Sequence, residues 1–228
     1  IDDSIFDPNK ISFNARLNIQ QQNGDEVSFE LPLKNLPQKI PDNWRINTLD
    51  EKRVLVHASG PQDFFVPSQR ALKVQSAGQL PKGFDPGADY NSHNHPRGLQ
   101  MTVFGASDAL GSVGIDWADL SQHVSADQIS VYAGSGMSQL DAQSNGGMMS
   151  ARFNDRRVSA KQCPFGFAEM PADFINAYIL GSLGTTGTSM GACASFLYNL
   201  RQAMTDIQSG RSQIAIVGNS EAPIIPEI

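Results

Sequence analysis

Two short apolar segments constrain the fold of this 228-residue chain more than any other feature. "QISVYAG" at 128–134 and "QIAIVG" at 213–218 are shorter than a typical helix and mostly apolar, as strands buried on both faces of a sheet are. Helical patterns accompany them at 99–115, 170–181 and about 193–209. Because short buried strands here alternate with helices, the sequence predicts an α/β layered fold from residue 76 to 228.

Proline and glycine mark the expected helix ends in this region. Pro171 suits the first turn of a helix, because its missing N–H would have no partner there. Gly181 is placed to end the same helix, and Gly210 to end the helix that runs from about Cys193 to Ser209. The sequence therefore predicts well-defined boundaries for both helices.

Residues 1–75 have a different pattern and are predicted to form a β-rich segment. "ISFNARLNIQQQ" and "EVSFELPL" flank Asn23-Gly24, a pair that favours a tight hairpin, so we expect these two strands to pair. A second pair is expected between 44–49 and 53–59, with its turn near Asp50-Glu51. The segment is either a separate unit or an insertion.

Charge and cysteine content exclude several classes of protein. Lys and Arg total 17 against 23 Asp and Glu, and the resulting charge of −6 argues against nucleic acid or an anionic membrane as partner. No apolar run approaches the roughly 18 residues of a membrane span, and no signal peptide is visible. Two cysteines are too few for a disulfide scaffold, so we expect a cytoplasmic protein.

Cys193 is the residue that most strongly suggests chemistry. Its ordinary interpretation is a small core side chain, because free cysteines are often buried. Gly191, Ala192 and Ala194 favour a different interpretation, since they leave the backbone around the thiol open to a ligand. The expected helix also starts at the thiol, and its free N–H groups would favour a thiolate.

The residues after Cys193 extend this interpretation. Phe196, Leu197 and Leu200 predict that the helix is buried, where its dipole is poorly screened. The amide of Cys193 is a natural donor to an oxyanion. The functional hypothesis is therefore that Cys193 is an acyl-transfer nucleophile, which would also need a base such as histidine.

Two other motifs carry weaker signals. "AGSGMSQLD" at 133–141 follows a strand, as a dinucleotide loop does, but it lacks the third glycine at the required spacing. His93 and His95 could form a metal pair, although no Cys, Asp or Glu cluster completes a site nearby. They are interpreted as polar loop side chains, and no metal or cofactor is expected.

The segment "GACASFLYNLRQAMTDIQSGRSQIAIVGNSEA" resembles the nucleophile turn, following helix and next strand of the β-ketoacyl-ACP synthases, condensing enzymes of the thiolase superfamily. "LGSLGTTG", "AGSGMSQL" and "PADFIN" resemble further segments of the family, over roughly residues 76–228. The resemblance implies a thiolase-like fold, of which this chain would form the N-terminal half.

The resemblance also implies roles for individual residues. Cys193 matches the nucleophile, and Glu221 matches the glutamate that follows the strand. Met137 lies where a residue of the acyl pocket would lie, and Gly191 and Ala194, beside the nucleophile, are the other expected substrate-binding residues. Gly191 stands where the family usually has threonine.

Three longer phrases, "AGQLPKGFDPG", "HNHPRGLQMTVFGASDA" and "GFAEMPADFINAYILG", are similar to a divergent subgroup that condenses acetyl-CoA with malonyl-ACP. The family's two histidine motifs, His-Gly-Thr-Gly and Gly-His-x-x-Gly, do not occur in this chain. The chain is therefore interpreted as an internal fragment that carries the nucleophile but not the C-terminal histidine half.

The resulting expectation is a ketosynthase of fatty-acid biosynthesis. Cys193 would accept an acyl group from acetyl-CoA or another thioester and then react with malonyl-ACP, with acyl carrier protein as a partner. The resemblance implies a homodimer joined near Thr188 to Ala192. A cysteine hydrolase and a non-catalytic partner subunit related to the condensing enzymes remain as alternatives.

Overall fold

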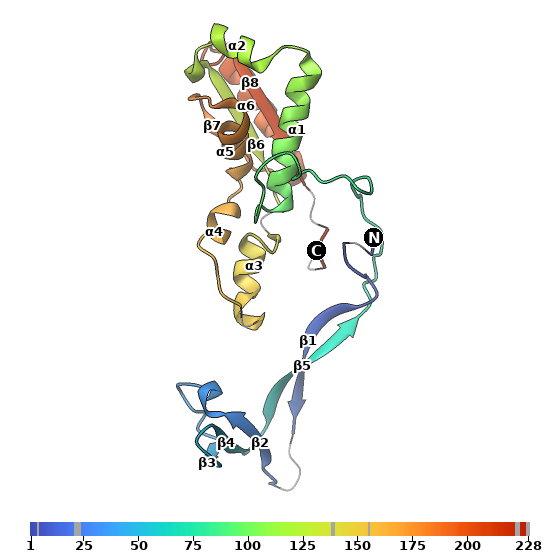
Figure 1. The fold of residues 1–228 in the computed structure, drawn as a ribbon, viewed down its shortest axis with the longest axis vertical. Helices are drawn as coiled ribbons and strands as arrows, with labels where there is room; N and C mark the ends of the chain where they lie inside the picture. Colours follow the sequence, from blue (N-terminus) through green and yellow to red (C-terminus); the bar gives the residue numbers. More distant parts are fainter. Residues whose placement is uncertain (4, 21–23, 138–139, 155, 222–223, 227–228) are drawn as a thin grey trace. The chain divides into compact units, whose positions relative to one another are not determined.

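The structure of the protein is a computed structural model that describes residues 1–3, 5–20, 24–137, 140–154, 156–221 and 224–226. The chain divides into two compact units, Ile1–Ser76 and Ala77–Ile228 (Figure 1). The first unit consists of antiparallel strands, and the second combines helices with a parallel sheet.

The first unit is organised around one apolar strand. Its elements are β1 (Ile11–Ile19), β2 (Val27–Pro32), the 3-10 turn η1 (Leu33–Asn35), β3 (Trp44–Thr48), β4 (Arg53–Ala58) and β5 (Gln62–Arg70). β4 lies between β2 and β3, and its alternate side chains Val54, Val56 and Ala58 are buried. The expected pairing of β3 with β4 is confirmed, with Asp50 accepting two backbone hydrogen bonds in the turn.

The expected hairpin at Asn23-Gly24 is wrong. β1 pairs with β5 over nine residues on each strand, and β2 pairs with β4. Asn23 itself lies outside the described residues, while Gly24 has a φ of +77°. The Asn-Gly pair favours a local turn, but β4 is paired on both edges, with β2 and with β3, so its backbone N–H and C=O groups find partners on both sides.

The second unit contains a three-stranded parallel sheet with helices on both faces. Its elements are α1 (Arg97–Val113), α2 (Trp117–His123), η2 (Ala126–Gln128), β6 (Ile129–Gly134), α3 (Asn145–Ser150), η4 (Ala151–Asn154), α4 (Gln162–Phe165), α5 (Met170–Ile175), the π turn η5 (Asn176–Leu180), β7 (Thr186–Gly187), η6 (Ala192–Ala194), α6 (Ser195–Gln208) and β8 (Ile214–Asn219). The strand order is β7-β6-β8. The two apolar segments of the sequence are thus β6 and β8, paired with each other.

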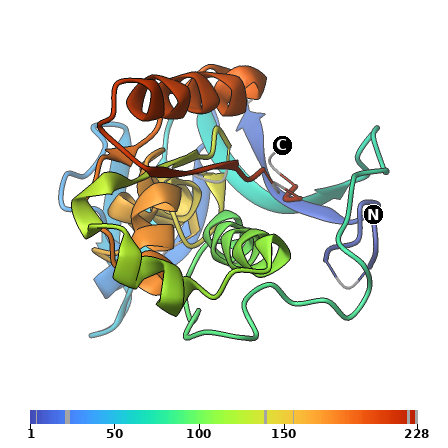
Figure 2. The same cartoon turned by 90° about the horizontal axis from the view of Figure 1, so that it is seen from above.

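β6 separates two layers of helices. Ile129, Val131 and Ala133 point to one face, where they pack with residues of α1 and α5 in the main core. Tyr132 points to the opposite face and bonds to Asp206 of α6. Figure 2 shows α6 on one side of the sheet and α1 and α5 on the other. All six residues of β6 are buried, as expected for a central parallel strand.

The helix ends agree with the sequence signals. Gly181 follows η5 in the left-handed conformation, with a φ of 60°, and Gly210 follows α6 with a φ of 71°. Pro171 lies in the first turn of α5. These residues therefore end or begin helices for the local reasons that predict them.

Aromatic rings surround His95 at the start of α1. Phe165, Phe174 and Tyr178 pack against its imidazole with centroid distances of 5.4, 5.0 and 5.9 Å, and the ring of Tyr90 lies 5.7 Å away. Burial, with the nearby charge of Lys161 as second cause, lowers the pKa of His95 below its usual range. Burial also raises the pKa of Tyr90 to about 12. His95 is therefore a packing residue of this cluster in its neutral form.

We predict that the second unit loses stability as the pH falls below about 7. Because the folded state holds His95 at a lowered pKa, the unfolded chain binds a proton first, and stability decreases as the pH passes downward through the ordinary histidine pKa of about 6.5. His95→Phe should flatten the dependence of the thermal midpoint on pH between 7 and 5, measured on the complete protein. Lys39→Met, in the first unit, serves as the control. An unchanged dependence in His95→Phe would contradict the prediction.

Candidate functional site

Cys193 lies in a tight turn immediately before α6. It is the middle residue of the 3-10 turn η6, so the α-helix begins two residues later than the sequence suggests. The Cys193 thiol is free and the residue is exposed. Ala192, just before it, has a φ of 48°, a left-handed conformation that few non-glycine residues adopt. A reagent or substrate can therefore reach the thiol from solvent.

Ser195 bridges the backbone on the N-terminal side of Cys193. Its hydroxyl accepts a hydrogen bond from the Gly191 amide at 3.0 Å and donates one to the Ala192 carbonyl at 2.7 Å. The amide of Ala194 also donates to the Gly191 carbonyl. Ser195 has no exposed surface. The turn that carries the thiol is thus closed by a buried hydroxyl of the helix that follows it.

Asn199, one helical turn further along α6, is hydrogen-bonded to the segment that precedes η6. Its side-chain oxygen accepts a hydrogen bond from the Ser189 amide at 2.7 Å, and its amide nitrogen donates to the Thr188 hydroxyl at 3.0 Å. Thr188 in turn lies against Gly134 at the end of β6. A Cβ added at Gly134 would overlap the Thr188 hydroxyl. Asn199 is fully buried. The chain from β7 to Cys193 is therefore fixed to both α6 and β6.

The far end of α6 is held by a third buried polar residue, Asp206. Its carboxylate accepts a hydrogen bond from the Tyr132 hydroxyl and another from Arg211 at 2.8 Å. Asp206 is fully buried, whereas the Arg211 side chain is largely exposed. Burial and the bond to Asp206 raise the pKa of Tyr132, which keeps this phenol a donor.

Within this chain, the apolar side chains at the start of α6 are not buried as the sequence predicts. Phe196, Leu197 and Leu200 are 43%, 63% and 37% exposed. The helix instead turns its polar face to the sheet, because Ser195, Asn199 and Asp206 find hydrogen-bond partners there. Among the described residues, the apolar face of α6 is left largely open.

Glu221 fixes the turn that contains Met137. Its carboxylate accepts hydrogen bonds from the amides of Gly136 and Met137 and from the Ser135 hydroxyl, the last two at 3.1 and 3.4 Å. A Cβ on Gly136 would lie 3.1 Å from this carboxylate. The glutamate after β8 therefore orders the glycine turn after β6. Met137 is 40% exposed.

Gly191 lies directly beneath an aromatic ring. A Cβ at this position would overlap Cδ2 and Cε2 of Tyr198 in α6. A threonine, for which Gly191 stands, would meet the same ring. Ala194, on the other side of Cys193, is partly buried. The open backbone expected at Gly191 is thus occupied by Tyr198.

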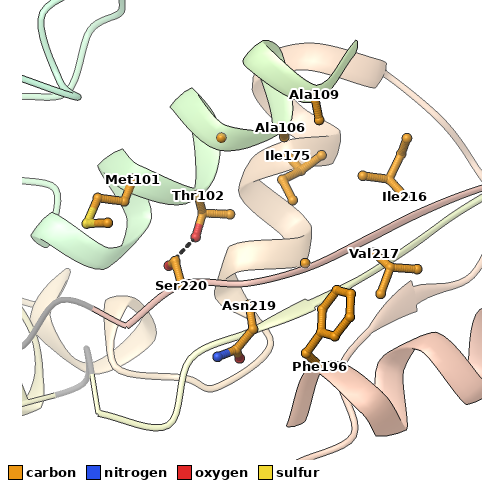
Figure 3. A pocket seen from close by; sticks show the side chains of 12 residues that line it. Met101, Thr102, Ala106, Ala109, Ile175, Phe196, Ile216, Val217, Asn219 and Ser220 are labelled. Carbon is orange, nitrogen blue, oxygen red and sulfur yellow. Dashed lines mark hydrogen bonds between the residues drawn. The ribbon is translucent and has the colours of Figure 1, made fainter. Parts of the chain in front are cut away.

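A cavity of about 280 Å³ lies along β8 (Figure 3). Ile216 to Asn219 of β8 and the following Ser220 line one side, Met101, Thr102, Gly105, Ala106 and Ala109 line it from α1, and Ile175 and Phe196 complete the wall. Figure 3 shows the hydrogen bond between Thr102 and Ser220 at one end, 2.6 Å long. In the described part of the chain, β8 has one neighbouring strand, β6. The cavity therefore lies along a strand at the edge of the sheet. None of Cys193, Met137, Gly191 and Ala194 lines it.

The other candidate residues belong to other elements than the nucleophile turn. His57 is on β4 of the first unit, bonded to Ser28 and Asn47, and His123 ends α2. The described residues contain no group of three or more His, Cys, Asp or Glu side chains able to hold a metal ion. Cys163 lies in α4 and is free and exposed like Cys193. A helix long and apolar enough to cross a bilayer is not found in the described ranges.

Sequence reasoning missed Ser195, Asn199 and Asp206, the residues that hold α6. Their spacing of four and seven residues places them on one helical face, which was a usable signal. Polar residues on one face of an amphipathic helix normally indicate the solvent side, and that rule gives the wrong orientation here.

Comparison with known proteins gives consistent matches. A family model described as "Beta-ketoacyl synthase, N-terminal domain" matches residues 40–228. The chain is 50% identical over its whole length to the beta-ketoacyl-[acyl-carrier-protein] synthase FabY of Pseudomonas aeruginosa. It is 27% identical, over 93% of its length, to the fatty acid synthase alpha subunit pigJ of Monascus ruber, of which it covers 12%.

The crystal structure of the ketosynthase FabY from P. aeruginosa matches all of this chain with a TM-score of 0.92. The chain covers 36% of that protein, so it spans about a third of the length of this relative. The fold is therefore thiolase-like, and the chain corresponds to part of a longer enzyme.

We predict that Gly191→Ala destabilises the protein and that Tyr198→Ala suppresses this loss. The added methyl overlaps the Tyr198 ring, and overpacking of this kind costs about 1 kcal/mol where the ring is half exposed and can rotate. The thermal midpoints of both single variants and the double variant of the complete protein measure the coupling. Gly187→Ala, where a Cβ meets no atom within 4 Å, is the matched control. An equal loss with and without the Tyr198 ring would contradict the prediction.

Proposed function

The chain belongs to the β-ketoacyl synthase family, and we propose that it supplies the nucleophile half of a condensing enzyme of fatty-acid synthesis. The observation that carries the proposal is the exposed thiol of Cys193 on a turn with a left-handed Ala192, closed by buried side chains of α6. An exposed, backbone-constrained thiol at a helix start is suited to accept an acyl group.

The first step is acyl transfer to Cys193. The Sγ thiolate attacks the carbonyl carbon of an acyl thioester, and the amide of Cys193 is the proposed donor to the oxyanion. The tetrahedral intermediate collapses, the bond from carbon to the donor sulfur breaks, and the departing thiolate takes up a proton. Acetyl-CoA or another short acyl thioester is the proposed donor, and Met137, Gly191 and Ala194 are the proposed neighbours of the acyl group.

The second step forms the carbon–carbon bond. Malonyl-ACP loses CO₂, and the resulting carbanion attacks the acyl carbon on Cys193. The bond from that carbon to Sγ breaks, which returns the thiolate and releases the β-ketoacyl product on the carrier protein. Decarboxylation needs acidic or basic groups beside the malonyl thioester, and we place these in the part of the longer protein outside this chain.

Two features support that division. The four histidines of the chain lie in other elements than the nucleophile turn, at His57, His93, His95 and His123. The apolar face of α6 is open, with Leu197 63% exposed and Met204 51% exposed. A face of this kind beside a nucleophile is suited to be covered by the part that completes the site.

The proposed partners follow from this chemistry. Acyl carrier protein delivers the malonyl unit, and a second copy of the protein joins near Thr188 to Ala192. The short strand β7 (Thr186–Gly187), just before this segment, lies at the edge of the sheet order β7-β6-β8. The cytoplasm is the proposed location, since both cysteines are free. Residues 1–75 are proposed to be a subgroup-specific insertion, and 76–228 the thiolase-like half.

We predict that the complete protein gains one acetyl group on Cys193 when it is incubated with acetyl-CoA. The thiol is exposed, so the donor can reach it without rearrangement of the core. Intact-mass measurement should show an adduct of one acetyl group, absent from Cys193→Ala and retained in Cys163→Ala, the variant of the other exposed cysteine.

The outcome separates the alternatives. Hydrolysis of the thioester without an adduct, lost in Cys193→Ala, would indicate a cysteine hydrolase. A folded protein that neither accepts the acetyl group nor hydrolyses the donor would indicate a non-catalytic partner subunit, and the proposed function would be wrong.

A further inference from the structure

The hydroxyl of Ser195 occupies an unusual place in the nucleophile turn. It lies two residues after Cys193, yet both of its backbone bonds, to Gly191 at 3.0 Å and Ala192 at 2.7 Å, are made with residues before Cys193. The thiol-bearing residue is thereby enclosed in a small hydrogen-bonded loop. The Ser195 hydroxyl also lies 3.9 Å from the sulfur of Met190.

This loop holds a backbone conformation that the local sequence disfavours. Ala192 has a φ of 48°, and a non-glycine residue keeps such a conformation only when its surroundings determine it. The donated bond from Ser195 to the Ala192 carbonyl fixes the peptide between Ala192 and Cys193. That peptide carries the amide of Cys193, the proposed oxyanion donor.

A second tie acts from one helical turn further on. Asn199 bonds both the Ser189 amide and the Thr188 hydroxyl, at 2.7 and 3.0 Å, and it is fully buried. Ser195 and Asn199 therefore fix two successive parts of the segment that leads to Cys193. Both side chains are on α6, so the orientation of the thiol depends on this helix.

We propose that Ser195 is a positioning residue that orients the Cys193 amide and thiol for acyl transfer, with Asn199 as a second support. This inference rests on the proposed function, since it assigns a role within the same step. In that step Sγ forms a bond to the acyl carbon, the donor's carbon–sulfur bond breaks, and the donor leaves as a thiol. Ser195 acts through the backbone and exchanges no proton with the substrate.

The test compares Ser195→Ala with Ser209→Ala in the complete protein. Ser209 directly follows α6, and its hydroxyl donates a hydrogen bond to the carbonyl three residues before it, as Ser195 does. The two serines lie at opposite ends of the helix. We expect Ser195→Ala to slow acetylation of Cys193 by acetyl-CoA about 10- to 100-fold, the effect of a small misplacement of reacting groups. Ser209→Ala should leave the rate unchanged.

Three further measurements distinguish positioning from general stability. Alkylation of Cys193 by iodoacetamide needs no oxyanion donor, so its rate in Ser195→Ala should stay within about twofold of wild type. Ser195→Thr restores the hydroxyl and should recover most of the acetylation rate. Thr188→Val, an isosteric change, removes a partner of Asn199 and should reduce the acetylation rate several-fold.

Each outcome decides between the possibilities. If wild type accepts acetyl and folded Ser195→Ala does so at the same rate, the positioning role is wrong while the proposed function stands. If wild type takes no acetyl group, the proposed function is wrong and the positioning role is wrong with it. If Ser195→Ala fails to fold, Thr188→Val and Ser195→Thr are used for the test instead. Acetylation of Thr188→Val at the wild-type rate would then overturn the proposal.

Discussion

The structure around Cys193 depends on the hydrogen bonds made by the buried polar face of α6. Ser195, Asn199 and Asp206 have no exposed surface, and each bonds a group outside the regular helix, at the nucleophile turn, at the preceding segment and at Tyr132 of β6. A buried polar group without a partner costs about 1–3 kcal/mol, so rotation of the helix about its axis would break several bonds at once. The helix is therefore held in one orientation, and with it the turn of Cys193.

This orientation explains the exposed apolar face. When the polar side of an amphipathic helix faces the sheet, the apolar side must face away, which leaves Leu197 and Met204 more than half exposed. Contiguous apolar side chains of this size usually mark a surface that another part of a protein covers. The chain spans about a third of its FabY relative, and we infer that part of the remainder covers this face. α6 would then be a helix between two layers, fixed to one by hydrogen bonds and to the other by apolar packing.

The sequence predicts those features that local physics determines. The strands β6 and β8 are recognisable because both are short and apolar, and Gly181 and Gly210 end helices because glycine readily adopts a positive φ. Features set by distant contacts were not predictable in this way. The Asn23-Gly24 pair favours a hairpin, but β2 pairs instead with β4, a strand further along the chain. Likewise the sequence draws attention to Cys193 through its small neighbours, and its role stays a prediction, while the hydrogen bonds of Ser195 depend on which face of α6 meets the sheet.

The backbone of the proposed nucleophile turn is fixed by contacts within the second unit. Every bond described around Ala192 comes from the second unit, so the strained turn is formed by the same residues that make the sheet and its helix. A glycine at 192 would adopt a φ of 48° with less strain, but it would equally allow other conformations. With alanine at this position, fewer backbone conformations compete with the one that the Ser195 hydrogen bond stabilises. The geometry of the Cys193 turn is thus determined within this chain, which leaves proton chemistry and a cover for α6 as the proposed contribution of the rest of the enzyme.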